Sequence, residues 1–354
     1  MALNSGSKTV LKKISYVPIL IVFFMYSIAF SMTFPALPKL LLTFTHDDST
    51  MASDYFGAVT TLKFLLEFFS GPFLGSLSDR IGRRPILLFS LFALVIEMFL
   101  LALLPSIAII FLSRAMSGMF DATVAIVYAA VSDIAFANDD FVTKNFGSIS
   151  AIFSLSVVIG PLLGVYLCRT SISLCFMVAG GILIFSLLFC YCFVAETRPH
   201  KPTTKPQNTM SIDIFSAVDK KQDDKIDSED ISFCPNPFAP FKSFFCNSEL
   251  RVLSYPFILA HLSSGIHYVW MLYLKERFSA SFMDVGLFLA ITGASVMIAQ
   301  GLLIKNVVPD LFSEETTATI CMCFTSIQLL CFGNSTLPTS LNLFWPTTFS
   351  NLPF

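Results

Sequence analysis

The sequence is short of charged residues. Only 13% of its 354 residues are Asp, Glu, Lys or Arg, whereas soluble domains carry about 25%. Hydrophobic residues make up 55% of the chain, and the mean hydropathy is +0.75. Phenylalanine alone occurs 39 times, which suits a surface that faces lipid. The composition therefore excludes an ordinary soluble protein and predicts a membrane protein with several spans.

The sequence also lacks the patterns that most enzymes and cofactor-binding proteins require. Its net charge is −2, so no basic surplus is present to neutralise nucleic-acid phosphates. It contains no phosphate-binding P-loop, no HExxH, no GxSxG and no CxxC. The four histidines and nine cysteines form no set with metal-ligand spacing. We therefore predict no enzymatic activity, cofactor, metal site or nucleic-acid partner.

Long apolar runs dominate what is present. About 20 apolar residues cross a hydrocarbon layer of about 30 Å. Six runs of that kind precede residue 197, at roughly 15–43, 54–77, 84–104, 106–136, 143–167 and 172–195. Three more follow, at about 250–275, 283–305 and 315–333. Residues 335–354 contain three prolines, so we expect no stable tenth span there and an incomplete second set of helices.

The runs divide the chain into three parts. We expect a six-helix transmembrane bundle in 1–196, a charged and partly disordered linker in 197–248, and a partial transmembrane bundle in 249–354. The linker holds seven acidic and seven basic side chains, a composition typical of a solvated segment. Lysines precede the first span, and three arginines follow the second. Because Lys and Arg are enriched in cytoplasmic loops, the N-terminus and the linker are predicted to be cytosolic.

The loop after the second span reads GSLSDRIGRRP over residues 75–85. It combines two glycines, one acid and three arginines: Gly75, Gly82, Asp79, Arg80, Arg83 and Arg84. One interpretation is a generic positively charged turn. The pattern, however, resembles at every defining position the signature loop G-x-L-[SA]-D-R-x-G-R-[RK] of the major facilitator superfamily. The resemblance implies an all-α membrane fold and a cytosolic gate in which Asp79, Arg80 and Asp133 interact.

Two further segments support this resemblance. Arg114 and Gly118 in the fourth span are similar to the R-x-x-x-G element of the superfamily. The fifth span resembles the proton-antiporter signature G-x8-G-x3-G-P-x2-G-G, with Ser and Val in place of two glycines. The matching residues are Gly147, Gly160, Pro161 and Gly164, and by resemblance they form a helix pivot. Within the superfamily, the chain looks most similar to tetracycline-resistance-type antiporters and hippocampus-abundant-transcript proteins.

Charged residues inside the spans are candidates for a substrate or proton pathway, because each costs about 2.5–3.5 kcal/mol at a helix centre. Lys63 and Glu67 share a helix face at i, i+4, as either a self-neutralised structural pair or a functional site. Arg114 and Asp121 belong to a polar stripe along the fourth span. His261 and His267 in the seventh span are candidates too, because histidine is the side chain that ordinarily changes charge near neutral pH.

The leading hypothesis is secondary active transport of a small organic solute by alternating access, within a lipid bilayer. In one version, protons are coupled through Asp121, Arg114 or Lys63. The alternative is a truncated, non-transporting isoform or incomplete gene product that acts as a partner subunit.

Overall fold

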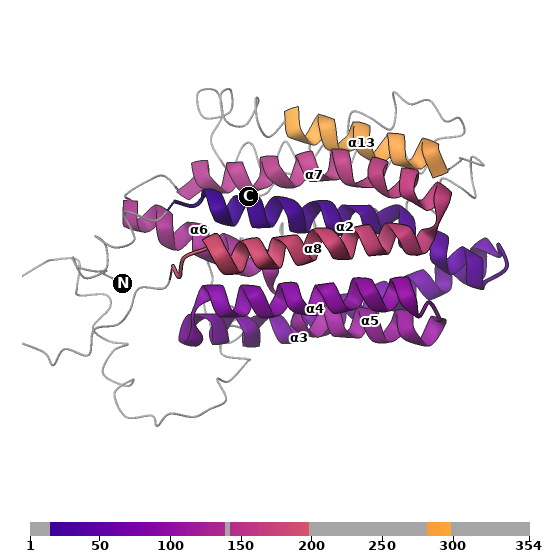
Figure 1. Ribbon diagram of the computed structural model, residues 1–354, viewed down its shortest axis with the longest axis horizontal. Helices are drawn as coiled ribbons and strands as arrows, with labels where there is room; N and C mark the ends of the chain where they lie inside the picture. The colour runs from indigo at the N-terminus through magenta and orange to yellow at the C-terminus, as the bar shows by residue number, and fades with distance from the viewer. Residues whose placement is uncertain (1–14, 139–141, 198–281, 299–354) are drawn as a thin grey trace, which may run out of the picture.

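The computed structural model describes residues 15–138, 142–197 and 282–298. Within these ranges every regular element is an α helix. The expectations for the 197–248 linker beyond Thr197, for His261 and His267, and for residues 335–354 lie outside the described residues. The helices run side by side as an elongated bundle (Figure 1). They are α2 (Val17–Phe44), α3 (Ser49–Ile81), α4 (Arg83–Leu103), α5 (Ile107–Phe120), α6 (Thr123–Asn138), α7 (Val142–Thr170), α8 (Ile172–Phe193) and α13 (Phe282–Ile298).

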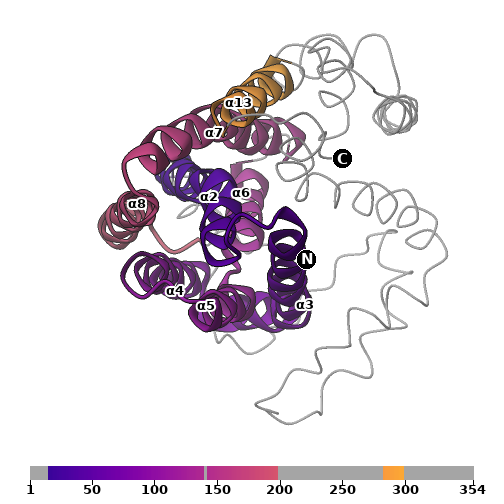
Figure 2. The same cartoon turned by 90° about the vertical axis from the view of Figure 1, so that its right-hand side faces the viewer.

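The bundle is organised around α2. This helix packs against α7 and α8 and also contacts α3 and α6, while α4 packs against both α8 and α5 (Figure 2). Its side chains at Val22, Phe23 and Met32 are almost completely buried. Helix α13 lies along α7 and is far later in the sequence. The amino-terminal helices thus form one packed unit with a second layer beside α7.

Five segments of the described chain are long and apolar enough to cross a membrane. They are Val17–Phe44, Arg83–Leu103, Ile107–Ala135, Gly147–Thr170 and Ile172–Phe193. Helix α3 is not among them, and it carries five charged side chains, at Asp54, Lys63, Glu67, Asp79 and Arg80. Its central charges point to a helix that faces the bundle interior over part of its length, because lipid does not solvate them.

Helices α3 and α4 are joined by one residue, Gly82. Gly82 has φ +129°, a value that L-residues with a Cβ rarely adopt. It ends α3 and immediately precedes α4. The second glycine of the loop pattern, Gly82, is therefore required by the backbone conformation at this turn.

The fourth span is interrupted, which corrects the expectation of one continuous helix over 106–136. Helix α5 ends at Phe120, Asp121 is extended (φ −81°, ψ 103°), and α6 begins at Thr123. The Asp121 carboxylate accepts a hydrogen bond from the Thr123 amide at 3.1 Å, and the Ala122 amide donates to Ser90 Oγ at 3.2 Å. These side chains satisfy the amides that the break releases from the helix. The polar stripe therefore does not form one continuous helical face.

Candidate functional site

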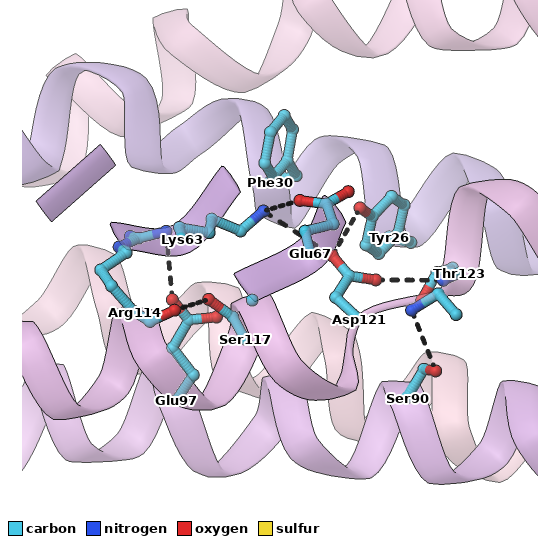
Figure 3. A network of polar contacts seen from close by, with 12 residues as sticks. Tyr26, Phe30, Lys63, Glu67, Ser90, Glu97, Arg114, Ser117, Asp121 and Thr123 are labelled. Carbon is cyan, nitrogen blue, oxygen red and sulfur yellow. Dashed lines mark hydrogen bonds and ion pairs between the residues drawn. The ribbon is translucent and has the colours of Figure 1, made fainter. Parts of the chain in front are cut away.

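Five charged side chains meet inside the bundle, between α3, α4 and the α5–α6 break (Figure 3). We call them the charged cluster: Lys63, Glu67, Glu97, Arg114 and Asp121. All are buried except Glu67, whose side chain is 39% exposed. Four of the five are residues that the sequence marks as a candidate pathway. The fifth, Glu97, is brought to them by the packing of α4 against α5.

Lys63 connects two carboxylates of the charged cluster. Its Nζ lies 3.6 Å from Glu67 Oε2, one helical turn along α3, and 3.9 Å from Asp121 Oδ2. The hydroxyl of Tyr26, from α2, donates to Asp121 Oδ2 at 3.1 Å. The break in the fourth span holds Asp121 in this position, because its other oxygen caps α6. One ammonium thus links α3 to the middle of the fourth span.

Arg114 and Glu97 form the second half of the charged cluster. Arg114 Nη1 lies 3.1 Å from Glu97 Oε1, and both side chains are buried. The sequence offers no partner for Glu97, because α4 and α5 come together only in the packed bundle. A charge left alone in such surroundings destabilises a protein by about 3–5 kcal/mol, so the two residues depend on one another.

Two aromatic rings lie near the Lys63 ammonium. Nζ lies 5.4 Å from the centroid of the Phe30 ring and 5.5 Å from that of Phe64. Both distances are within the range of a cation–π interaction. Phe30 in turn stacks on Tyr26, with ring centroids 6.0 Å apart. Phe30 and Tyr26, which the sequence did not single out as site residues, therefore belong to the surroundings of Lys63.

A small cavity adjoins the charged cluster. It leaves about 10 Å³ for the centre of a water molecule, which suffices for about one water. Its lining residues are Tyr26, Phe30, Lys63, Leu94, Glu97, Met98, Arg114 and Leu183. Arg114 Nε and Nη2 are buried and have no hydrogen-bond partner within the described part of the chain. The cavity is therefore lined by both charged and apolar side chains, and unused donors of one lining residue are buried.

Gly118 sets the distance between α5 and α3. A Cβ at this position would collide with the backbone carbonyl of Lys63 and lie 3.0 Å from Leu66 Cβ. The Ser70 hydroxyl donates to the Gly118 carbonyl at 2.8 Å. The glycine that follows Arg114 by one turn is thus needed for the close contact that brings Lys63 and the fourth span together.

The loop of residues 75–85 forms a second charged site at one end of the bundle, centred on Arg83. Arg83 Nη1 lies 2.6 Å from Asp79 Oδ1, and Arg83 Nε donates to Asp133 Oδ2 at 3.1 Å. The same guanidinium donates to Ser78 Oγ at 2.7 Å. Resemblance placed Arg80 in this network with Asp79 and Asp133. In the structure Arg83 joins the two acids, and Arg80 lies on the exposed surface.

Glu196 completes this end of the bundle. Its carboxylate accepts hydrogen bonds from the backbone amides of Arg83 at 2.8 Å and Arg84 at 3.1 Å. It thereby caps the start of α4, where Gly82 has no side chain to do so. Arg84 also donates to the carbonyl of Tyr191 near the end of α8 and lies over the Tyr191 ring. The sequence showed Glu196 only as a boundary residue, because its partners are more than a hundred positions away.

The pivot residues of α7 differ in their surroundings. A Cβ at Gly160 would collide with Ser31 Oγ of α2, and one at Gly164 would lie 2.7 Å from the Met32 carbonyl oxygen. A Cβ at Gly147 would meet nothing within 4 Å in the described part of the chain. Gly160 and Gly164 thus permit close packing of α7 on α2, whereas Gly147 makes no such contact with the described residues.

The opposite side of α7 packs on α13. A Cβ at Gly286 would lie 2.7 Å from Val165 Cγ2 and 3.6 Å from the Pro161 carbonyl oxygen. Val165 occupies the position where the antiporter pattern has its last glycine. Where α7 has Val165 instead of a glycine, the facing helix α13 therefore has a glycine, Gly286, in contact with it.

Comparison with known proteins agrees with this architecture. A family model for the Major Facilitator Superfamily matches residues 19–350. Tetracycline resistance protein, class C, of Escherichia coli is 30% identical over 77% of this chain and 62% of its own length. The human hippocampus abundant transcript-like protein 1 is 26% identical over 85% of this chain and 54% of its own. The chain thus spans less than two thirds of the length of these two relatives.

Solved structures share the fold at lower identity. The crystal structure of the human organic anion transporter MFSD10 (TETRAN) has a TM-score of 0.66 and 20% identity, covering 95% of this chain and 82% of that one. A bacterial homologue of the human lysosomal transporter Spinster has a TM-score of 0.61 and 13% identity, over 98% of this chain and 72% of that one. Family and fold confirm the predictions of an all-α, multi-pass membrane protein that is not an enzyme. The chain belongs to the Major Facilitator Superfamily.

Proposed function

We propose that the protein is a secondary transporter that carries a small organic solute across a membrane by alternating access, with protons coupled through the charged cluster. The observation that carries this proposal is the cluster itself: five ionisable side chains inside a helix bundle, beside a small cavity that three of them line. Charged groups within membrane spans are expensive and mark substrate or proton pathways. The relatives named for tetracycline resistance and the neighbour named as an organic anion transporter support transport of an organic solute.

The charge balance of the cluster supports proton coupling. Glu67, Glu97 and Asp121 carry three negative charges when ionised, and Lys63 and Arg114 carry two positive ones. The cluster as a whole is therefore left with one negative charge in surroundings of low dielectric. Uptake of one proton neutralises it, and Glu67 offers the route because it is the most exposed member. A proton and a solute then act on the same group of side chains.

The two other sites supply what alternating access requires. We assign the Arg83 network to the cytosolic gate. Arg83 connects α4 to Asp79 of α3 and to Asp133 of α6. Glu196 connects the start of α4 to the segment after α8. Opening this end requires those contacts to break. We assign the pivot to α7, which packs on α2 through Gly160 and Gly164 and on α13 through Val165. In this arrangement residues 1–196 are one transmembrane bundle, 249–354 contribute to the second, and the N-terminus and 197–248 are cytosolic.

Flux through proteoliposomes tests the proposal. The full chain is reconstituted with a pH-sensitive dye inside the vesicles, and tetracycline or a small organic anion is added with and without a pH gradient. We expect solute movement that depends on the gradient and proton movement that depends on the solute, both absent from Glu67→Gln vesicles. Solute flux that ignores the gradient would refute proton coupling. Absence of flux for every solute would favour the alternative of a non-transporting partner subunit.

A further inference from the structure

The surroundings of the Lys63 ammonium have the composition of a site for a cation. Two carboxylates lie within 4 Å of Nζ, from Glu67 and Asp121. Two aromatic rings lie within 6 Å of it, from Phe30 and Phe64. Carboxylates and aromatic faces together are how proteins bind organic ammonium groups. Here the group in place is the chain's own lysine.

The electrostatics of the site favour a positive ligand over a negative one. With Lys63 in place the charged cluster still holds one excess negative charge. The other cation, Arg114, is already paired with Glu97 at 3.1 Å. Tyr26 adds a hydroxyl that donates to Asp121. An anion at this position would meet the carboxylates of Glu67 and Asp121, whereas a cation would restore neutrality.

The site can be approached from one side. The side chains of Glu67 and Phe64 are 39% and 37% exposed, while Lys63 behind them is almost fully buried. The cavity beside Lys63 has room for about one water. Lysine has a flexible four-carbon stem, so its ammonium can move away from the carboxylates while the backbone of α3 stays in place.

We propose that Lys63 is a tethered occupant of an organic-cation site formed by Glu67, Asp121, Phe30 and Phe64, and that the solute is an organic cation that displaces it. This inference rests on the proposed function and gives its solute a charge. Lys63 competes with the solute as an intramolecular ligand. A tethered group acts at an effective concentration of about millimolar or above, so it sets how tightly a cation must bind to enter.

Equilibrium binding to the purified full chain in detergent tests this. The probe is benzyltrimethylammonium, and benzenesulfonate is its anionic counterpart. Lys63→Met removes the tethered competitor, so we expect the affinity for benzyltrimethylammonium to rise about tenfold or more. Lys39→Met is the matched control, because the Lys39 amine lies on α2 and donates to the Cys168 carbonyl. Its affinity should equal that of the unaltered protein.

A second variant protects the test against a loss of folding. Glu67→Gln keeps Lys63 but removes one carboxylate, and we expect it to bind benzyltrimethylammonium about tenfold or more weakly. The inference is overturned if the affinity for benzyltrimethylammonium is unchanged in Lys63→Met or in Glu67→Gln. It is also overturned if the protein binds benzenesulfonate preferentially. The outcome is separable from the proposed function. Cation binding without flux would refute the transport function and leave the cation site intact. Flux of anions with no cation binding would refute the cation site and leave the transport function intact.

Discussion

Arg114 and Glu97 form an ion pair inside the bundle, with Nη1 and Oε1 3.1 Å apart. The pair joins α5 to α4 at a depth where neither side chain is more than 7% exposed. Because both ions are desolvated, their mutual attraction is what makes either one tolerable.

This pair gives a first prediction about stability. Glu97→Gln and Arg114→Gln should each lower the free energy of unfolding by about 3–5 kcal/mol, because each leaves a buried charge alone. The double variant should recover most of that loss, since it leaves no unpaired charge. Thermal unfolding of the purified protein in detergent measures this. A double variant that loses the sum of the two single effects would contradict the coupling.

A second prediction concerns the loop of residues 75–85. Arg83→Gln should open that end of the bundle more than either acid variant, because one guanidinium holds both acids. Asp133→Asn should have a larger effect than Asp79→Asn, since the Asp133 side chain is 27% exposed and that of Asp79 is 63%. Exposed ion pairs contribute only about 0–1 kcal/mol.

Labelling of a cysteine introduced beside the loop measures its accessibility to a water-soluble maleimide. Arg169→Gln is the control, because Arg169 is an exposed arginine in the last turn of α7 and is not one of the residues of the Arg83 network. Equal labelling of the Arg83 and Arg169 variants would show that Arg83 does not hold this end closed.

A third prediction concerns Glu196 and Gly82. Glu196→Ala should destabilise the protein by about 1 kcal/mol, the usual effect of losing a helix cap. Gly82→Ala should destabilise it more, because its Cβ would lie 2.5 Å from Glu196 Oε2 and its φ is +129°. In the double variant the collision disappears but the backbone strain remains. Gly82→Ala should therefore still be destabilising in the Glu196→Ala background, and a neutral result there would mean that the turn has no strain.

A fourth prediction uses two glycines of the same helix. Gly164→Ala should lower the melting temperature and slow transport, because the new Cβ would lie 2.7 Å from the Met32 carbonyl oxygen. Gly147→Ala has open space around its Cβ and should be neutral or stabilise α7 by up to about 1 kcal/mol, the propensity difference between the two residues. Melting curves and proteoliposome flux measure the two effects. Equal behaviour of the two variants would exclude close packing of α7 on α2 as the function of Gly164.

Local patterns account for what the sequence determined by itself. Apolar run length predicted the ends of α2, α4, α7 and α8 to within a few residues, because burial in lipid depends on the composition of one segment. The pairing of Lys63 with Glu67 follows from helical spacing, since residues four apart lie on the same face. The family was also recognisable from a local pattern, the 75–85 loop, whose glycine meets a backbone requirement at Gly82.

Tertiary packing decided the rest. The contact of Arg83 with both Asp79 and Asp133 depends on where α6 places Asp133. The partner of Glu97 depends on how α4 meets α5, and the break at Asp121 depends on Ser90 of a neighbouring helix taking up a released amide. Each of these contacts joins residues that are far apart in the chain. Hydropathy and helical periodicity describe the neighbourhood of a residue along one helix, whereas the partner of a buried charge is fixed only when the helices pack.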